Sequence, residues 1–396
     1  MKYVNYYSIL IILLVTACDN YDISTKQAET FVRYYGVGLE DEGMKVITTN
    51  EGYLIMANVK NPGSGRDICI ITTDKYGNTT APVTTIGGAF DDIGYAIKPR
   101  GEGYIIAGSS QTSQSGNKHI YFVQIRADGS VDWEIPPIDT LNSNEALDVL
   151  VPNSTELIFT GYTERGEAAS KRAIYYLKYD TSKDRDSAIV VFNLQKNDNY
   201  DLVANSITYL EGESTYVFAG YRSNAETKYI YLLQWDGSTG GTLPLTISTD
   251  GTSEAISIIN GTEEGSCWVA CNHELSSTES EILLYKTYAN FSNTETPRSL
   301  GERSMNRVQS IALHGNSLFL CGTSSSGELQ YGDMTIIRFN ENSPNPQYIY
   351  IGDGTSYTGN GFDLTNESGY VVTGAGYLNE KSMIALYKVN SEGNLW

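Results

Sequence analysis

Histidine, cysteine and positive charge are scarce in this sequence. Its 396 residues include 3 His and 5 Cys, and 27 Lys and Arg stand against 47 Asp and Glu, for a net charge of −20. Five cysteines in so long a chain do not make a disulfide framework. The excess of negative charge disfavours nucleic acids and anionic lipid surfaces as partners.

The motifs of several enzyme classes are missing as well. The histidines form no close metal-binding pair, and the chain has no His-Glu-x-x-His, no Gly-x-Ser-x-Gly and no Gly-x-x-x-x-Gly-Lys motif. Cys267 and Cys271 lie too far apart on one strand to form a disulfide, and they lack the second ligand pair of a zinc site. We expect no catalytic residue, no cofactor and no metal, with four buried free thiols at Cys69, Cys267, Cys271 and Cys321.

Long apolar runs are also missing beyond the first residues. The run from Ile9 to Val15 is too short to span a bilayer and has the size of a signal-peptide core. It ends in Val15-Thr16-Ala17-Cys18, which resembles the lipobox of bacterial lipoproteins and implies a lipidated Cys18. We therefore expect a signal peptide at 1–17, a lipidated cysteine and short tether at 18–29, and a lipid-anchored protein of the cell envelope, at the outer membrane.

What the sequence does contain is a sevenfold repeat. Short apolar segments read GYLIMA, GYIIAG, ELIFTG, TYVFAG, CWVACN, SLFLCG and GYVVTG, starting at Gly52, Gly103, Glu156, Thr215, Cys267, Ser317 and Gly369. Further apolar segments flank each copy, and turns such as Asp74 to Gly77 separate them. Four antiparallel strands in a repeat of about 50 residues are typical of a propeller blade. The sequence thus predicts an all-β, seven-bladed β-propeller over residues 30–396.

Two features favour a closed ring over an open solenoid. Small residues recur in the first strand of each unit, where we expect crowding around a central axis, at Gly43, Gly94, Ala146, Ala204, Ala255, Val308 and Gly361. The seventh unit stops after its third strand, whereas Thr30 to Gly38 looks like an isolated fourth strand. We predict that this N-terminal strand completes the last blade, so that no sheet edge stays open between the first and last blades.

The repeats resemble the kelch-like and SBBP-like propeller repeats of lipoproteins from the Bacteroidota. The shared features are the GYIIAG strand at Gly103, the Gly-Ser-Ser that starts at Gly108, and the Gly-x-x-x-Trp that ends at Trp133. The resemblance covers residues 30–396. The resemblance implies a propeller architecture. It does not indicate a function, because such propellers bind many different ligands.

Polar residues gather in the loops that lead into the innermost strands. We predict that they ring one end of the axial channel as a candidate binding rim, made of Glu40, Asp41, Asp92, Asn144, Asp201, Glu254, Asn306 and Tyr357. Aligned with Asp92, the seven units read Asp41, Asp92, Asn144, Leu202, Ser253, Asn306 and Gly359. Such a column is a polar rim and not the matched acid and base of a glycosidase.

Two classes of function fit these observations. The first is a non-enzymatic scaffold lipoprotein that binds another envelope protein through the rim side of the propeller. The alternative is a surface lipoprotein that binds a glycan or small ligand, and a glycoside hydrolase comes third. We expect the protein not to bind nucleic acid. We expect it to contact the membrane through its lipid anchor only.

The N-terminal strand also predicts an orientation. Loops between blades and between second and third strands share one face, which carries the rim and the segments expected as long loops, Asn58–Asp67, Ser109–Lys118, Tyr162–Arg172 and Thr323–Gly332. An N-terminal fourth strand starts on the opposite face, and an 11-residue tether reaches at most about 40 Å. We therefore expect the rim to point away from the membrane and to carry the partner site.

Overall fold

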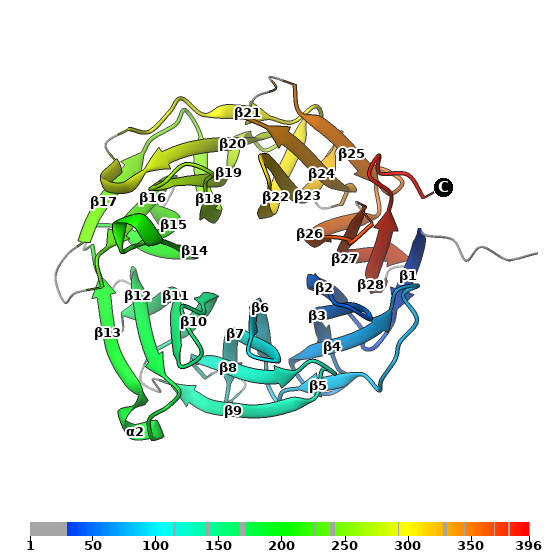
Figure 1. Cartoon of the computed structure of the whole chain (residues 1–396), viewed down its shortest axis with the longest axis horizontal. Helices are drawn as coiled ribbons and strands as arrows, with labels where there is room; N and C mark the ends of the chain where they lie inside the picture. The colour runs from blue at the N-terminus through cyan, green and yellow to red at the C-terminus, as the bar shows by residue number, and fades with distance from the viewer. Residues whose placement is uncertain are drawn as a thin grey trace, which may run out of the picture.

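Seven four-stranded antiparallel sheets surround a central axis in the computed structural model (Figure 1). It describes residues 30–113, 116–138, 142–165, 171–197, 199–224, 227–237, 242–291, 293–327, 331–341, 343, 345–367, 369–378 and 381–395. The predicted signal peptide (1–17), Cys18 and the tether (18–29) lie outside these residues. The predicted fold class, an all-β seven-bladed propeller, is confirmed.

The strands follow the chain from the axis outwards in the first six blades. Blades 1 to 3 contain β2 (Asp41–Thr48), β3 (Gly52–Lys60), β4 (Arg66–Asp74), β5 (Thr84–Ile86); β6 (Asp92–Arg100), β7 (Gly103–Gln111), β8 (Lys118–Arg126), β9 (Val131–Ile138); and β10 (Asn144–Leu150), β11 (Glu156–Arg165), β12 (Lys171–Asp180), β13 (Ile189–Gln195). Blades 4 and 5 contain β14 (Asp201–Leu210), β15 (Thr215–Ser223), β16 (Lys228–Trp235), β17 (Thr242–Ile247); and β18 (Thr252–Asn260), β19 (Ser266–Ser276), β20 (Glu279–Tyr288), β21 (Arg298–Leu300). Blade 6 contains β22 (Met305–His314), β23 (Ser317–Ser325), β24 (Asp333–Asn340) and β25 (Gln347–Ile351).

The seventh blade combines both ends of the described chain. Its strands β26 (Tyr357–Leu364), β27 (Tyr370–Leu378) and β28 (Lys381–Val389) are joined on the outside by β1 (Phe31–Tyr35), as the predicted ring closure requires (Figure 1). Phe31 pairs with Lys388 and Tyr35 with Ile384, in antiparallel register. The Tyr34 hydroxyl also lies 2.8 Å from the hydroxyls of Tyr357 and Tyr387. Strand pairing and a tyrosine cluster therefore hold the closure together.

The hydrophobic core lies between the blades. Buried apolar side chains of the described residues form seven clusters, and each cluster joins two neighbouring blades. Phe122 of blade 2 stacks on Phe159 of blade 3 at 4.4 Å, and Tyr176 of blade 3 stacks on Trp235 of blade 4 at 4.1 Å. Since no blade buries its apolar faces alone, each blade depends on its neighbours for stability.

The small residues of the first strands face the preceding blade, not the axis as we expected. A Cβ on Gly43 would lie 2.2 Å from Thr373 Oγ1 of blade 7, and one on Gly94 would lie 3.1 Å from Met56 Sδ of blade 1. In blade 7 the equivalent residue is Gly359, which pairs with Gly374 as Gly43 pairs with Ala57, so the predicted alignment of Gly361 was wrong. Close packing of blades is the reason for these small residues.

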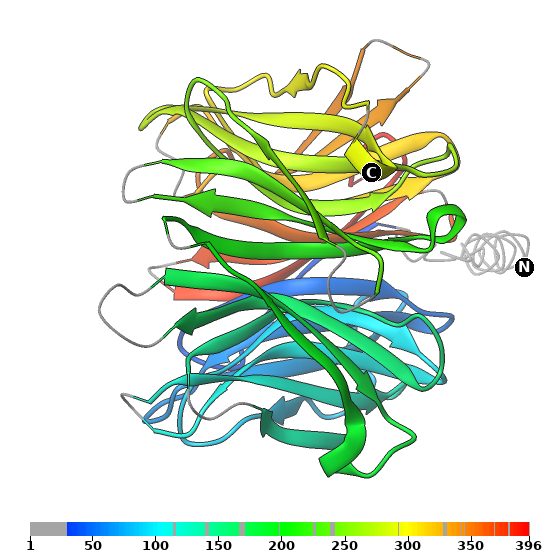
Figure 2. The ribbon, with the colours of Figure 1, turned by 90° about the vertical axis from the view of Figure 1, so that its left-hand side faces the viewer.

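Two faces bound the propeller (Figure 2). We call the face with the between-blade loops and the connections of second to third strands the upper face, and the opposite one the lower face. The expected long loops on the upper face are short, because strands extend into them; only 61–65 separates β3 from β4. Two of the longest connections, 75–83 and 289–297, lie on the lower face instead. Loop length therefore does not distinguish the upper face.

Candidate functional site

A cavity of about 680 Å³ runs along the axis and is lined by the innermost strands of the seven blades. Directly after each small residue, the first strand has a β-bulge, where two of its residues face one residue of the second strand. The extra residues all line the cavity: Met44, Tyr95, Leu147, Asn205, Ile256, Gln309 and Asn360. A ring of seven bulges therefore determines the surface of the channel.

The residue after each bulge adds charge and hydroxyl groups to this surface. Lys45, Asp148, Ser206, Ser257 and Ser310 occupy this position in five blades and line the channel. Asp148 accepts hydrogen bonds from the Ser206 hydroxyl (2.9 Å) and from the backbone N–H of Ile207 (3.1 Å) in blade 4. It also forms an ion pair with Lys98 of blade 2 at 3.7 Å. Its charge thus links three blades.

Two of the predicted rim carboxylates are buried and cap loops. Asp41 is 1% exposed, and its carboxylate accepts hydrogen bonds from the backbone N–H groups of Val37 (2.7 Å) and Gly38 (2.9 Å). Asp92, 4% exposed at the equivalent position, accepts one from the N–H of Gly88 at 2.8 Å. Both carboxylates fold the between-blade loop onto the strand that follows it.

Two further rim residues join neighbouring blades, and a third is bound within the loop that precedes it. Asp201 accepts a hydrogen bond from the backbone N–H of Arg172, the second residue of β12, at 2.6 Å. Asn306 donates its backbone N–H to the Ser280 hydroxyl at 3.0 Å. Asn144 is fully buried at the start of β10 and donates to the carbonyl of Asn142 at 2.9 Å. These polar groups are used by the protein itself.

The remaining rim residues occupy different places. Glu254 lines the channel and pairs with Lys228 at 2.6 Å. Glu40 is exposed on the upper face and pairs with Lys60 (3.1 Å) and Arg66 (2.8 Å). Tyr357 is buried in the tyrosine cluster that it forms with Tyr34 and Tyr387. The pairing register shows that Tyr357 is the blade 7 equivalent of Asp92, and not Gly359 as we predicted. The predicted rim is therefore not one continuous ligand surface.

Sequence reasoning missed a buried carboxylate, Glu145. It pairs with Lys118 at 2.7 Å and accepts hydrogen bonds from the hydroxyls of Tyr162 (2.6 Å) and Tyr95. Burial raises the pKa of Glu145, but these donors outweigh burial and hold it below its ordinary value. A signal was present in the sequence, because Glu42, Glu145 and Glu254 each directly precede a small residue of the first strands.

Exposed apolar and partly exposed aromatic side chains gather on the upper face where blade 7 meets blade 1, with Tyr331 added from blade 6. Leu39 is 46% and Leu378 is 41% exposed, and the rings of Tyr377 and Tyr331 lie 3.8 Å apart. Glu40 forms an isolated bridge with Ser382, which pairs with Tyr377, so these residues are neighbours. We call Leu39, Glu40, Arg66, Tyr331, Tyr377 and Leu378 the blade 7–1 patch.

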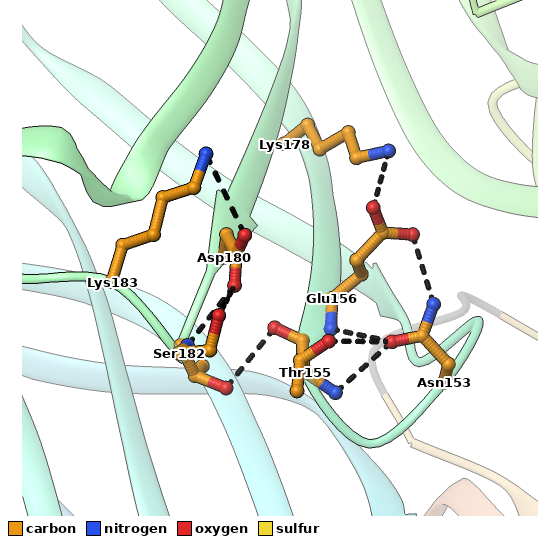
Figure 3. A network of polar contacts seen from close by, with 8 residues as sticks. Asn153, Thr155, Glu156, Lys178, Asp180, Ser182 and Lys183 are labelled. Carbon is orange, nitrogen blue, oxygen red and sulfur yellow. Dashed lines mark hydrogen bonds and ion pairs between the residues drawn. The ribbon is translucent and has the colours of Figure 1, made fainter.

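The turn after β12 of blade 3 lies on the lower face, and in it Asp180 points towards Ser182 and Lys183 (Figure 3). Asp180 accepts hydrogen bonds from the backbone N–H (3.0 Å) and hydroxyl (2.6 Å) of Ser182 and pairs with Lys183 at 3.6 Å. The turn continues into a short helix, α2 (Arg185–Ala188). Asp180 is thus a turn cap, and across the described part of the chain no three His, Cys, Asp or Glu side chains are placed to hold a metal ion.

The four cysteines of the propeller are buried and unpaired. Burial raises the pKa of Cys69, Cys267 and Cys321 to about 12. Such thiols stay protonated at neutral pH and react slowly.

Solved structures are similar to this chain in fold, whereas no family profile and no curated protein sequence matches it. Polysaccharide lyase Uly1 is 9% identical with a TM-score of 0.51, and the match covers 90% of this chain and 91% of that one. An oligogalacturonate lyase in complex with manganese is 11% identical with a TM-score of 0.50, covering 92% and 97%. The propeller domain of a protease from Pyrococcus furiosus is 9% identical with a TM-score of 0.47, covering 87% and 95%.

These similar proteins include enzymes. Sequence identities near 10% show a similarity of fold and not of function. Among the residues placed in the structure, no helix is both long and apolar enough to cross a membrane.

Proposed function

We propose that this chain is a lipid-anchored, non-enzymatic binding protein of the bacterial envelope whose upper face holds a protein partner. The blade 7–1 patch is the observation that carries the proposal. It combines two exposed leucines, which mark an interaction surface when they gather in one patch, with a tyrosine pair and an ion-paired arginine, and tyrosine and arginine are enriched among the residues that dominate interface energetics. The signal peptide, the lipidated Cys18 and the outer-membrane location belong to the same proposal.

Burying the patch supplies the driving force for docking. Exposed Leu39 and Leu378 each contribute about 1–2 kcal/mol when a partner covers them. Glu40, already paired with Arg66, loses little on docking because its charge stays compensated.

The test is capture of the partner from solubilised membranes, identified by mass spectrometry and then measured with the purified partner. Leu39→Glu with Leu378→Glu should weaken binding at least about tenfold, because two charges would be buried at the interface. Leu275→Glu is the matched control, since Leu275 is equally exposed (46%) on the same face in blade 5. Loss of binding with Leu275→Glu alone would place the partner over blade 5 and contradict the proposal.

The absence of catalysis has its own test. The purified protein should release no product from sialyl, glucosyl or peptide reporter substrates. Asp41 and Asp92 cap loops, so their asparagine variants should change stability and nothing else. A substrate turnover that Asp92→Asn or Asp41→Asn abolishes would overturn the non-enzymatic proposal.

A further inference from the structure

Two buried carboxylates face each other on the upper face where blade 1 meets blade 2 (Figure 1). Asp67, the second residue of β4, is 5% exposed, and Asp92, the first residue of β6, is 4% exposed. The position that a Cβ on Gly87 would occupy lies 2.1 Å from Asp67 Oδ1 and 3.0 Å from Asp92 Oδ2. The two carboxylates therefore converge on one place, beside the exposed residues Gly87 and Gly88.

Neither carboxylate forms an ion pair with any residue that the structure describes. Asp67 Oδ2 accepts a hydrogen bond from the Asn61 amide at 2.5 Å, whereas Asp67 Oδ1 is buried and has no partner among the described residues. Asp92 Oδ2 accepts a hydrogen bond from the backbone N–H of Gly88 at 2.8 Å. Because these donors are neutral, the negative charges of both carboxylates stay uncompensated.

This arrangement is costly for the folded protein. Burial raises the pKa of Asp67 and of Asp92, and the charge of the neighbouring Asp91 raises both pKa values further. A buried carboxylate with an unbound oxygen needs a positive charge close to it to offset its lost hydration.

The equivalent carboxylate of blade 6 has such a positive charge. The pairing registers of β24 and β4 give Asp333 the position of Asp67. Asp333 pairs with the guanidinium of Arg303 at 2.6 Å. The next blade presents the ring of Tyr357 to Asp333, whereas it presents the carboxylate of Asp92 to Asp67. At the junction of blades 1 and 2, therefore, the described residues place a second negative charge and no cation.

We propose that Asp67 Oδ1 and Asp92 Oδ2 bind a calcium ion that enters from the upper face. The ion compensates both negative charges and is the missing partner of Asp67 Oδ1. Calcium takes carboxylate, backbone carbonyl and water oxygens in flexible geometry, so the exposed loop and solvent complete its coordination. Two carboxylates are fewer ligands than a high-affinity site has, and we expect a Kd of roughly 0.1–1 mM, as in extracellular calcium-binding modules. The site is separate from the blade 7–1 patch and does not depend on the proposed protein partner.

Calorimetric titration of the purified protein with CaCl2 tests the proposal. Asp67→Asn and Asp92→Asn should each weaken calcium binding at least about tenfold, because each variant removes one charged ligand. Asp333→Asn is the matched control, since it changes the same position in blade 6 and should bind calcium like the wild type. Should Asp333→Asn fail to fold, Asp250→Asn, at an exposed carboxylate of the upper face, replaces it.

Melting temperatures in EDTA and in CaCl2 distinguish a bound ion from a proton shared by the two carboxylates. The Tm of the wild type should rise by a few degrees in about 10 mM CaCl2, because the ion binds only the folded protein. In EDTA the site is empty, so the Tm of Asp67→Asn should equal or exceed that of the wild type, and calcium should not raise it. A Tm that rises with falling pH but not with calcium would show a shared proton and overturn the proposal. An undiminished calcium response in the variant with both Asp67→Asn and Asp92→Asn would also overturn it.

Discussion

At the scale of single residues, two buried carboxylates have opposite effects on stability. Glu145 has three hydrogen-bond donors, and its pKa is lowered. Asp67 is 5% exposed, one of its oxygens has no partner in the described residues, and burial with the nearby charges of Asp92 and Asp91 raises its pKa. One negative charge therefore stabilises the fold and the other costs stability.

Glu145→Gln should destabilise the protein by about 2 kcal/mol at neutral pH, because it leaves Lys118 without its counter-charge. A lowered folded-state pKa gives stability that is present above the ordinary value, 4.5, and lost as pH falls through the folded-state pKa. Urea unfolding should therefore show the largest difference from wild type at neutral pH and a shrinking one below pH 4.5. A difference independent of pH would contradict the role of the charge.

Asp67→Asn should have the opposite sign and raise the free energy of unfolding at neutral pH by about 1 kcal/mol. The raised folded-state pKa means that the wild-type protein gains stability as pH falls through it towards the ordinary value of 3.8. The advantage of the variant should therefore vanish in acid. A loss of stability at neutral pH would show that the bond from Asn61 needs the charged carboxylate.

At the scale of elements, β1 is the strand on which the ring depends. Removing it exposes the β28 edge and the cluster that contains Phe31 and Tyr35. A variant that starts at Glu40 should aggregate or melt well below one that starts at Asp19. Equal melting temperatures, measured by circular dichroism, would show that β1 does not contribute to the stability of the propeller.

The blades were predictable from the sequence, whereas the channel was not. Apolar segments and turns recur with a visible period, so strand order and closure followed from pattern and from the two complementary ends. A β-bulge leaves no recurring pattern in the sequence. Lys45, Asp148 and Ser206 occupy the same structural position in their blades, and this equivalence is visible only in the pairing register of the strands. The sequence pattern placed Asp41 and Asp92 in the loops, whereas they are the first residues of β2 and β6; their use as caps depends on backbone geometry that the pattern does not reveal.

At the scale of the whole molecule, the direction of β1 determines which face of the propeller the proposed lipid anchor would hold towards a membrane. Phe31 pairs with Lys388, close to the Asn390 turn, so the strand starts on the lower face. We expect that face to lie towards the bilayer. In vesicles containing spin-labelled lipid, a fluorophore on Lys75→Cys should be quenched more than one on Ser277→Cys of the upper face. The buried native thiols, with their raised pKa values, should not compete for the label. Stronger quenching on the upper face would reverse the orientation.

The ring of bulges separates the residues that line the channel from the residues that pair in the strand ladder. In a regular strand the same residues would do both. Because each extra residue is not part of the strand ladder, it can change without moving the register of its blade. Leu147 and Gln309 can thus diverge while the packing between blades is preserved, whereas Asn360 also donates to Glu42 and Gly43 of blade 1. Substitutions at the bulge positions that bond to no other blade would therefore change the chemistry of the channel surface and leave the backbone of the blades in place.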